Sequence, residues 1–316
     1  MALDLKPVDR VEVVTLQDNY LDVVAQDNDD VVRRVISHPG YSLRQAIRAE
    51  HGFSLLITVE RAGARRRMLF DFGYSEDGAR RNAEALDIDL REVEAAALSH
   101  GHFDHTGGMA ALMSRVAPSA ELVMHPAAVR NPRYVKKPNG GHVTFPPFIA
   151  EQLEKLTVRP HTTRAPYPLL DGQVGFLGEV PRVTDFEQPG GNMFYSDDAG
   201  EHLDHFADDT GLVINVAGKG LLVISGCAHS GIINTIRHAQ AVAGADTVYA
   251  VMGGFHLTGM DRDRLIRPTV DTLRAIDPEI VVPAHCTGRT AQQDIEAALP
   301  DAFVLNMVGT TLRLGA

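Results

Sequence analysis

The chain has 316 residues and a formal net charge of −11, with 44% hydrophobic and 22% charged residues. These values are those of an ordinary folded protein, and the acidity argues against a general binder of nucleic acids or acidic membranes. Two cysteines cannot form a disulfide framework, and no apolar run is long enough to cross a bilayer. Because the N-terminal segment lacks the pattern of a secretory signal, we expect a cytoplasmic protein with no nucleic-acid or membrane partner.

Short apolar runs alternate with helical patterns along the chain. The runs predict strands at 10–16, 53–60, 67–71, 94–98, 121–124, 211–217, 221–225, 247–251, 279–282 and 303–306. The spacing of apolar residues predicts helices at 41–50, 78–86, 107–116, 231–243, 262–276 and 290–298. Gly218 and Gly220 predict a hairpin between the strands that flank them. Hairpins mixed with interleaved helices favour an α/β fold built of layers around a mixed sheet.

The longest stretch without clear periodicity is 126–208, which is rich in Pro and Gly. A long irregular region inside a compact domain usually builds a functional site or covers one. We therefore expect this region to form loops over a site. No change in composition marks a linker, so we expect one domain over residues 1–316.

The densest cluster of metal-ligand residue types is His100-Gly-His102-Phe-Asp104-His105, which directly follows a predicted strand. Neutral imidazole suits Zn, Fe and Mn, and the carboxylate adds an oxygen donor. In an extended or turning backbone, the first two histidines can point one way while Asp104 and His105 turn toward a neighbouring position. A solvated loop with incidental histidines is the alternative. Three imidazoles and a carboxylate at this spacing favour a site for two adjacent metal ions.

This pattern resembles the signature of the metallo-β-lactamase superfamily, whose fold is a four-layer αβ/βα sandwich with metals at the edge of the sheets. The superfamily's first motif, with an aspartate that supports the metal loop from outside the ligand set, is similar to Leu69-Phe70-Asp71-Phe72-Gly73. Its last motif, with a histidine that binds the second metal, is similar to Pro283-Ala284-His285-Cys286-Thr287-Gly288.

Other segments resemble one branch of the superfamily, labelled dihydropteroate-synthase-like or 7,8-dihydropterin-6-methyl-4-(ribofuranosyl)aminobenzene 5′-phosphate synthase-like. The resemblance runs from about residue 10 to 312, and we expect residues 21–45 to be a local insertion. The segments that carry it are Glu50-His51-Gly52-Phe53-Ser54, Gly178-Glu179-Val180-Pro181-Arg182, Gly226-Cys227-Ala228-His229-Ser230-Gly231, Gly253-Gly254-Phe255-His256-Leu257 and His285-Cys286-Thr287-Gly288.

The chain departs from the superfamily pattern at two places. Many members carry a bridging aspartate where this chain reads Ser225-Gly226-Cys227, and the usual histidine before that hairpin is replaced by Asp208-Asp209. We expect His229 to supply the missing imidazole. The first metal would then have His100, His102 and His229 as ligands, and the second would have Asp104, His105 and His285. Cys227 is either a thiolate ligand, which would favour zinc, or a small buried residue.

Several further residues are candidates for contact with the substrate. His256 follows two glycines and can act as a general acid or oxyanion partner, or it is an ordinary loop histidine. His51 precedes a strand and is a candidate substrate contact. Basic residues that could hold an anion, unless they are simply solvated, are Arg130, Arg133, Lys136 and Arg182.

The resemblance implies a hydrolase-type enzyme with two divalent transition-metal ions, Zn²⁺ or else Fe or Mn. Asp104 would bind metal and orient a metal-bridged hydroxide that attacks a small anionic substrate. Suitable substrates are a phosphate ester, a lactone or a pterin-type phosphorylated compound. The alternatives are a metal-binding ligand sensor without turnover and a di-iron redox enzyme, although the latter usually has a flavodoxin-like partner domain. The pattern is compatible with a homo-oligomer.

Overall fold

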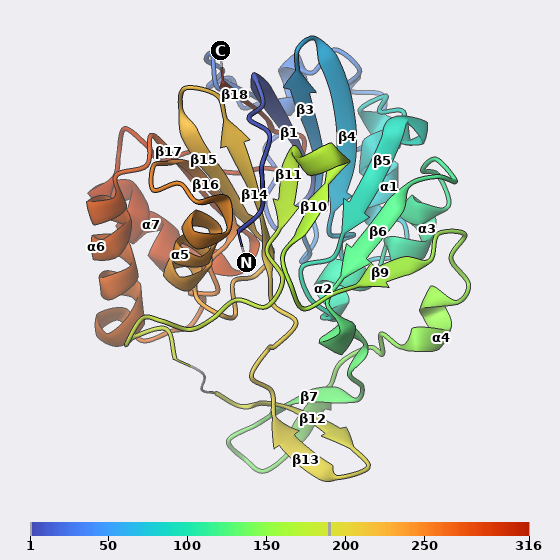
Figure 1. The fold of residues 1–316 in the computed structure, drawn as a ribbon, viewed down its shortest axis with the longest axis vertical. Helices are drawn as coiled ribbons and strands as arrows, with labels where there is room; N and C mark the ends of the chain where they lie inside the picture. Colours follow the sequence, from blue (N-terminus) through green and yellow to red (C-terminus); the bar gives the residue numbers. More distant parts are fainter. Residues whose placement is uncertain (1, 189–190, 316) are drawn as a thin grey trace.

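The structure is a computed structural model that describes residues 2–188 and 191–315. Two large sheets pack face to face, and helices cover the outer face of each (Figure 1). This layered arrangement confirms the α/β fold class that the sequence predicts. None of the helices in the described residues combines the length and the hydropathy needed to span a bilayer.

The first sheet has eight strands and contains both antiparallel and parallel pairs. The segment 21–45, expected to be an insertion, supplies its edge strand β2. In sheet order the strands are β2 (Val32–Arg33), β18 (Thr311–Gly315), β1 (Arg10–Gln17), β3 (Ser54–Arg61), β4 (Ala64–Phe70), β5 (Val93–Ala97), β6 (Glu121–Met124) and β9 (Pro160–Thr162).

The second sheet has six strands, and its β14 and β15 form the predicted hairpin, in which Gly211 pairs with Ser225. Strands β15, β16 and β17 run parallel to one another. In sheet order the strands are β10 (Tyr167–Leu169), β11 (Val174–Phe176), β14 (Gly211–Val216), β15 (Gly220–Ser225), β16 (Val248–Gly254) and β17 (Ile280–Ala284).

Alternating side chains of the strands divide the interior into three cores. In β3, Leu55 and Ile57 enter the core between the two sheets, whereas Leu56 packs beneath the helices on the outer face. A third core lies between the second sheet and its own helices. The first sheet is covered by α1 (Gly78–Ala85), α2 (Phe103–Thr106), α3 (Met109–Met113) and α4 (Ala150–Leu153), and the second by α5 (Ile232–Ala243), α6 (Arg267–Ile276) and α7 (Arg289–Ala298).

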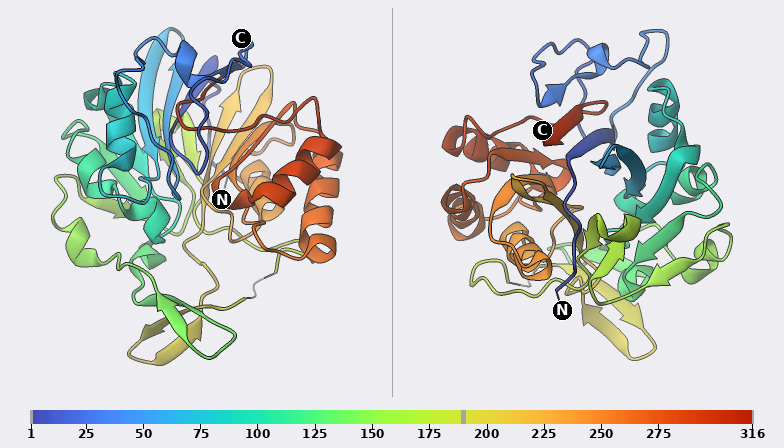
Figure 2. Two further views of the ribbon diagram at one scale, coloured as in Figure 1. Left: turned by 180° about the vertical axis from the view of Figure 1, so that it is seen from behind. Right: turned by 45° about the horizontal axis from the view of Figure 1, so that its top comes forward.

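Residues 126–208 contain more regular structure than their sequence indicates. Four short strands in this region form a separate antiparallel sheet that extends away from the two large sheets (Figures 1 and 2). We call this sheet the arm. Its strands, in order, are β13 (Gly200–Leu203), β12 (Met193–Asp197), β7 (Arg133–Lys136) and β8 (His142–Thr144).

Two elements expected from the sequence are absent from the described structure. Residues 41–50 are not helical. Leu43 and Ile47 have the four-residue spacing of a helix face, but only Ile47 is buried and Leu43 is 70% exposed. Residues 303–306 form no strand beyond one isolated bridge between Phe303 and Val281. The last strand along the chain is instead β18, which belongs to the first sheet.

One edge of the sandwich receives the ends of strands from both sheets. The parallel pairs β4–β5 and β15–β16–β17 direct their carboxyl ends toward it, and β3, antiparallel to β4, begins there. The residues that follow these strands therefore meet at one place, as in other sheets with parallel strands. This edge carries the histidine-rich segment that follows β5.

Gly101 lets the histidine-rich segment lie close to the chain after β6. A Cβ atom at this position would overlap the backbone oxygen of Ala128. We expect Gly101→Ala to lower the free energy of unfolding by about 1–3 kcal/mol, because backbone must move to make room. Urea denaturation measures this loss. Gly141→Ala is the matched control, since its new Cβ would meet only the Asn139 side chain at 3.4 Å, and an equal loss in both variants would contradict the explanation.

Candidate metal centre

The first cluster at this edge consists of three imidazoles. His100 and His102 lie in the turn after β5, and His229 lies in the turn after β15. The Nε2 atoms of His100 and His229 are 3.2 Å apart. The ring centroid of His102 is 4.5 Å from that of His100 and 4.8 Å from that of His229. The rings of the three residues expected at the first metal thus adjoin one another, but the compact group of donor atoms here contains His100, His229 and Cys227 and does not include His102.

The second cluster adjoins the first. Asp104 and His105 begin α2, and His285 follows β17. His285 Nε2 is 3.1 Å from His105 Nε2 and 3.1 Å from Asp104 Oδ2, and the distance from His105 Nε2 to Asp104 Oδ2 is 3.9 Å. These are the three residues expected at the second metal, and they too converge.

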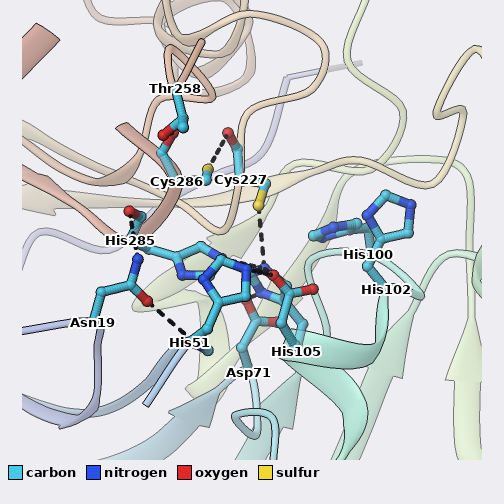
Figure 3. A network of polar contacts seen from close by, with 12 residues as sticks. Asn19, His51, Asp71, His100, His102, His105, Cys227, Thr258, His285 and Cys286 are labelled. Carbon is cyan, nitrogen blue, oxygen red and sulfur yellow. Dashed lines mark hydrogen bonds and ion pairs between the residues drawn. The ribbon is translucent and has the colours of Figure 1, made fainter. Parts of the chain in front are cut away.

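Cys227 lies between the two clusters (Figure 3). Its sulfur is 3.2 Å from His105 Nε2, and it belongs both to a compact group with His100 and His229 and to one with Asp104, His105 and His285. The side chain is 3% exposed. Its position is therefore the one that a bridging aspartate would take between two metals in the superfamily pattern.

The spacing of the donor atoms fits a metal ion. Tetrahedral Zn²⁺ with bonds of about 2.0–2.1 Å holds its ligand nitrogens roughly 3.3 Å apart, close to the separations of the Nε2 atoms in both clusters. Buried ring nitrogens without a hydrogen-bond partner among the described residues are His102 Nε2, His125 Nε2, His229 Nδ1, His256 Nδ1 and His285 Nδ1. A bound ion in the first cluster would supply a partner for His102 Nε2, whereas the unpaired Nδ1 atoms of His229 and His285 belong to rings whose Nε2 atoms already meet the clusters.

Asp71 and Ser99 orient the ligand-bearing segment. Asp71 lies 2.6 Å from His105 Nδ1 through Oδ2, and it accepts hydrogen bonds from the amide and the hydroxyl of Ser99. The Ser99 hydroxyl also contacts His100 Nδ1 at 2.9 Å. With both Nδ1 atoms engaged, the Nε2 atoms of His100 and His105 face the clusters, which is the usual arrangement around metal-binding histidines. This is the supporting position expected for Asp71.

Asp208 and Asp209 stand where the superfamily pattern has a histidine, and they brace two turns. Asp208 accepts a hydrogen bond from the backbone N–H of Gly101, and Asp209 accepts one from that of Ser230. Each carboxylate thus fixes a turn that carries histidines of the first cluster. The sequence shows the replaced histidine but does not reveal this role.

Asp18 and Asn19 hold the backbone of His285, and the sequence gives no signal of this. His285 has a φ of 48°, a strained conformation for a residue with a side chain. Its N–H donates to Asp18 Oδ1 at 2.9 Å, and its carbonyl accepts from the Asn19 amide at 2.9 Å (Figure 3). These bonds fix the strained turn that brings the ring into the second cluster.

Burial sets the charge states of the first cluster. It lowers the pKa of His102 to about 3 and those of His100 and His229 well below the ordinary value. All three rings are therefore neutral at neutral pH, which is the form that binds metals.

The second cluster carries charge. Burial opposes the ionisation of Asp104, but the neighbouring imidazoles outweigh it and hold its pKa well below the ordinary value. Burial also acts to lower the pKa of His105, but the carboxylates of Asp71 and Asp104 raise that pKa to about 9. A cation that binds His105 Nε2 would displace a proton.

Two further histidines contact the clusters. His256, after β16, has its ring centroid 4.1 Å from that of His229 and forms a third compact group with Cys227 and Cys286. His51, before β3, is 56% exposed and places Nε2 3.2 Å from Asp104 Oδ2. Both residues named as substrate-contacting candidates therefore lie at the centre, one inside and one at its solvent side.

The expected anion-binding residues have other partners. Arg133 is buried and pairs with Asp204 at 3.0 Å and Asp208 at 2.7 Å. Arg130 lies over the ring of Tyr195, and Lys136 pairs with Glu201 and lies over the ring of Phe194. Arg182 donates to the carbonyl of His205 at 2.7 Å and to that of His229 at 3.4 Å. The structure does not gather these four side chains into one anion site.

Two known proteins are similar to this chain over most of its length. A 7,8-dihydropterin-6-methyl-4-(β-D-ribofuranosyl)-aminobenzene-5′-phosphate synthase of Methanocaldococcus jannaschii is 29% identical over 295 residues, 92% of each chain. An uncharacterized protein of the same organism is 30% identical over 241 residues, 76% of this chain and 85% of that protein. These similarities confirm the branch expected from the motifs.

A solved structure described as a metal-dependent hydrolase of the beta-lactamase superfamily matches with a TM-score of 0.73 and 25% identity, covering 97% of this chain and 100% of that one. The family model of the metallo-beta-lactamase superfamily matches residues 48–285. The chain therefore belongs to the metallo-beta-lactamase superfamily.

Proposed function

We propose that the protein is a hydrolase-type enzyme whose centre holds two divalent transition-metal ions. The observation that carries this proposal is the convergence of two donor clusters on one shared sulfur, that of Cys227. The first ion takes His100, His102 and His229, and the second takes Asp104, His105 and His285. Because a thiolate among imidazoles suits zinc, Zn²⁺ is the preferred metal.

Bound divalent ions supply Lewis-acid chemistry, since they polarise the bond under attack and lower the pKa of a water molecule. Around them, the chain's own residues handle protons. Asp104 Oδ2 is 3.2 Å from His51 Nε2, and the His51 ring reaches solvent, so the Asp104 carboxylate can orient His51 to carry a proton from the centre to bulk water. His256, beside His229, can protonate the leaving group.

The substrate in this proposal is a small molecule with an ester-type bond. A phosphate ester or a lactone suits the chemistry, and the name of the methanogen relative adds a pterin-type phosphorylated compound. Because the relative is named a synthase, the proposal includes formation of a new bond by a related displacement as a second outcome.

The two ligand sets lead to a test by metal analysis. We expect the purified protein to hold about two zinc ions per chain, and His229→Ala and His285→Ala to hold about one each, because each variant removes a ligand of a different ion. Inductively coupled plasma mass spectrometry measures the metal content of each protein. His161→Ala, an exposed histidine on β9, is the control and should keep both ions. A single ion in the wild-type protein would contradict the two-ion assignment.

The shared sulfur leads to a spectroscopic test. In the cobalt-substituted protein we expect a sulfur-to-cobalt charge-transfer band, which Cys227→Ser removes and Cys286→Ser keeps. Cys227→Asp should bind as much metal as the wild-type protein and still lack the band, because a carboxylate oxygen also binds divalent ions. The reverse result for the two serine variants would mean that Cys286 is the ligand.

Turnover separates the enzyme from a ligand sensor. We expect hydrolysis of at least one class in a panel of aryl phosphodiesters, lactones and thioesters, with loss of the activity in EDTA and recovery on addition of Zn²⁺. For each compound in the panel, the steady-state rate of hydrolysis is compared with the binding affinity measured by calorimetry. Tight binding of one member with no turnover of any would favour the sensor.

A further inference from the structure

A pocket of about 250 Å³ opens beside the first cluster. His229 and His256 form part of its wall, so a molecule in the pocket would lie against both a candidate ligand and the candidate acid. A second apolar cavity, of about 280 Å³, lies near α2 and α4 but is lined by none of the candidate ligands. Of these two cavities in the described part of the chain, the pocket at His229 adjoins the centre.

The rest of the pocket wall is mostly apolar. Phe206 and Phe255 are buried, and Phe206 stacks on the ring of His229 with centroids 4.2 Å apart. Met260 is 38% exposed although it lines the pocket, which places it where the pocket meets solvent. The other large apolar side chains of the wall are Met193, Leu257 and Leu265.

Charge in the pocket wall disfavours an anion. Among the described residues that line it, Glu187 is the one with a carboxylate, and no lysine or arginine is present. The carboxylate of Glu187 is engaged at the start of α5, where it accepts the backbone N–H groups of Ile233 and Asn234 at 2.9 and 2.8 Å. A negatively charged group in this pocket would meet no lysine or arginine and would lie near a carboxylate, so protonated His256 would be its cationic partner among the described lining residues.

We propose that this pocket binds an uncharged aromatic or aliphatic group of the substrate, attached to the bond on which the centre acts. This inference rests on the proposed function and narrows its substrate class. A cavity of about 150 Å³ can hold benzene, so the volume here suits one ring system or a short chain. Any anionic part of the substrate then lies on the side of the metal ligands.

The chain contains no tryptophan, which gives the pocket a direct binding assay. Met260→Trp introduces a single tryptophan at the pocket, and 4-nitrobenzyl alcohol and 4-nitrobenzoate are matched uncharged and anionic quenchers of its fluorescence. In metal-free protein we expect saturable quenching by the alcohol and at least about tenfold weaker binding of the carboxylate. Tyr249→Trp, at the other end of β16, is the control and should show no saturable quenching. Equal or tighter binding of the carboxylate would overturn the proposal.

A second experiment uses the metal-loaded protein. Met260→Arg, compared with Met260→Leu, should raise KM for an uncharged aryl ester such as 4-nitrophenyl butyrate by about tenfold, with metal content unchanged in both variants. If phosphate esters are turned over and this KM does not respond, the pocket proposal fails while the proposed function stands. If the uncharged quencher binds as expected and no ester is turned over, the proposed function fails and the pocket remains a binding site.

Discussion

The carboxylate of Asp71 is the contact on which the geometry of the centre depends. It binds Ser99 and the ring of His105, and so fixes both ends of the ligand-bearing segment after β5. The second sheet approaches the same group, because Gly226 lies so close to Ser99 and Asp71 that a Cβ atom there would overlap the Ser99 hydroxyl. Asp71 itself has a φ of 60°, a strained conformation that these bonds stabilise. One buried carboxylate therefore positions ligands from the first sheet and the turn of the second.

The glycines after the parallel strands explain how a cysteine reaches the middle of the centre. Gly226 brings the turn after β15 against the first sheet, and Cys227 follows it directly. Gly254, at the end of β16, leaves room for the cysteines of both neighbouring strands, since a Cβ atom there would lie 2.7 Å from the sulfur of Cys286 and 3.2 Å from Cα of Cys227. Close packing of backbone is thus a condition for sharing one sulfur between two clusters.

Much of the centre was open to prediction because its signals are local. The histidine spacing after β5 and the single histidine after β17 each depend on one strand end, and the layered fold follows from strand and helix patterns. The place of Cys227 between the clusters depends on how two sheets pack, which no spacing encodes. The arm was missed because strands such as β8 are three residues long and exposed at every residue, so they show no alternation of burial. The false helix at 41–50 has one buried apolar residue, too few to fix a helix by packing.

Arg133 shows why a basic residue near such a centre need not bind the substrate. Its side chain is 3% exposed, and removing an unpaired guanidinium from water would be very costly. The pairing with Asp204 and Asp208 offsets that cost, and Asp208 in turn holds the amide of Gly101 between two candidate ligands. The guanidinium is therefore part of the support of the first cluster. With Arg133 and Lys136 paired to carboxylates and a mostly apolar wall beside His229, the proposed metal ions would be the chief source of positive charge for an anionic substrate.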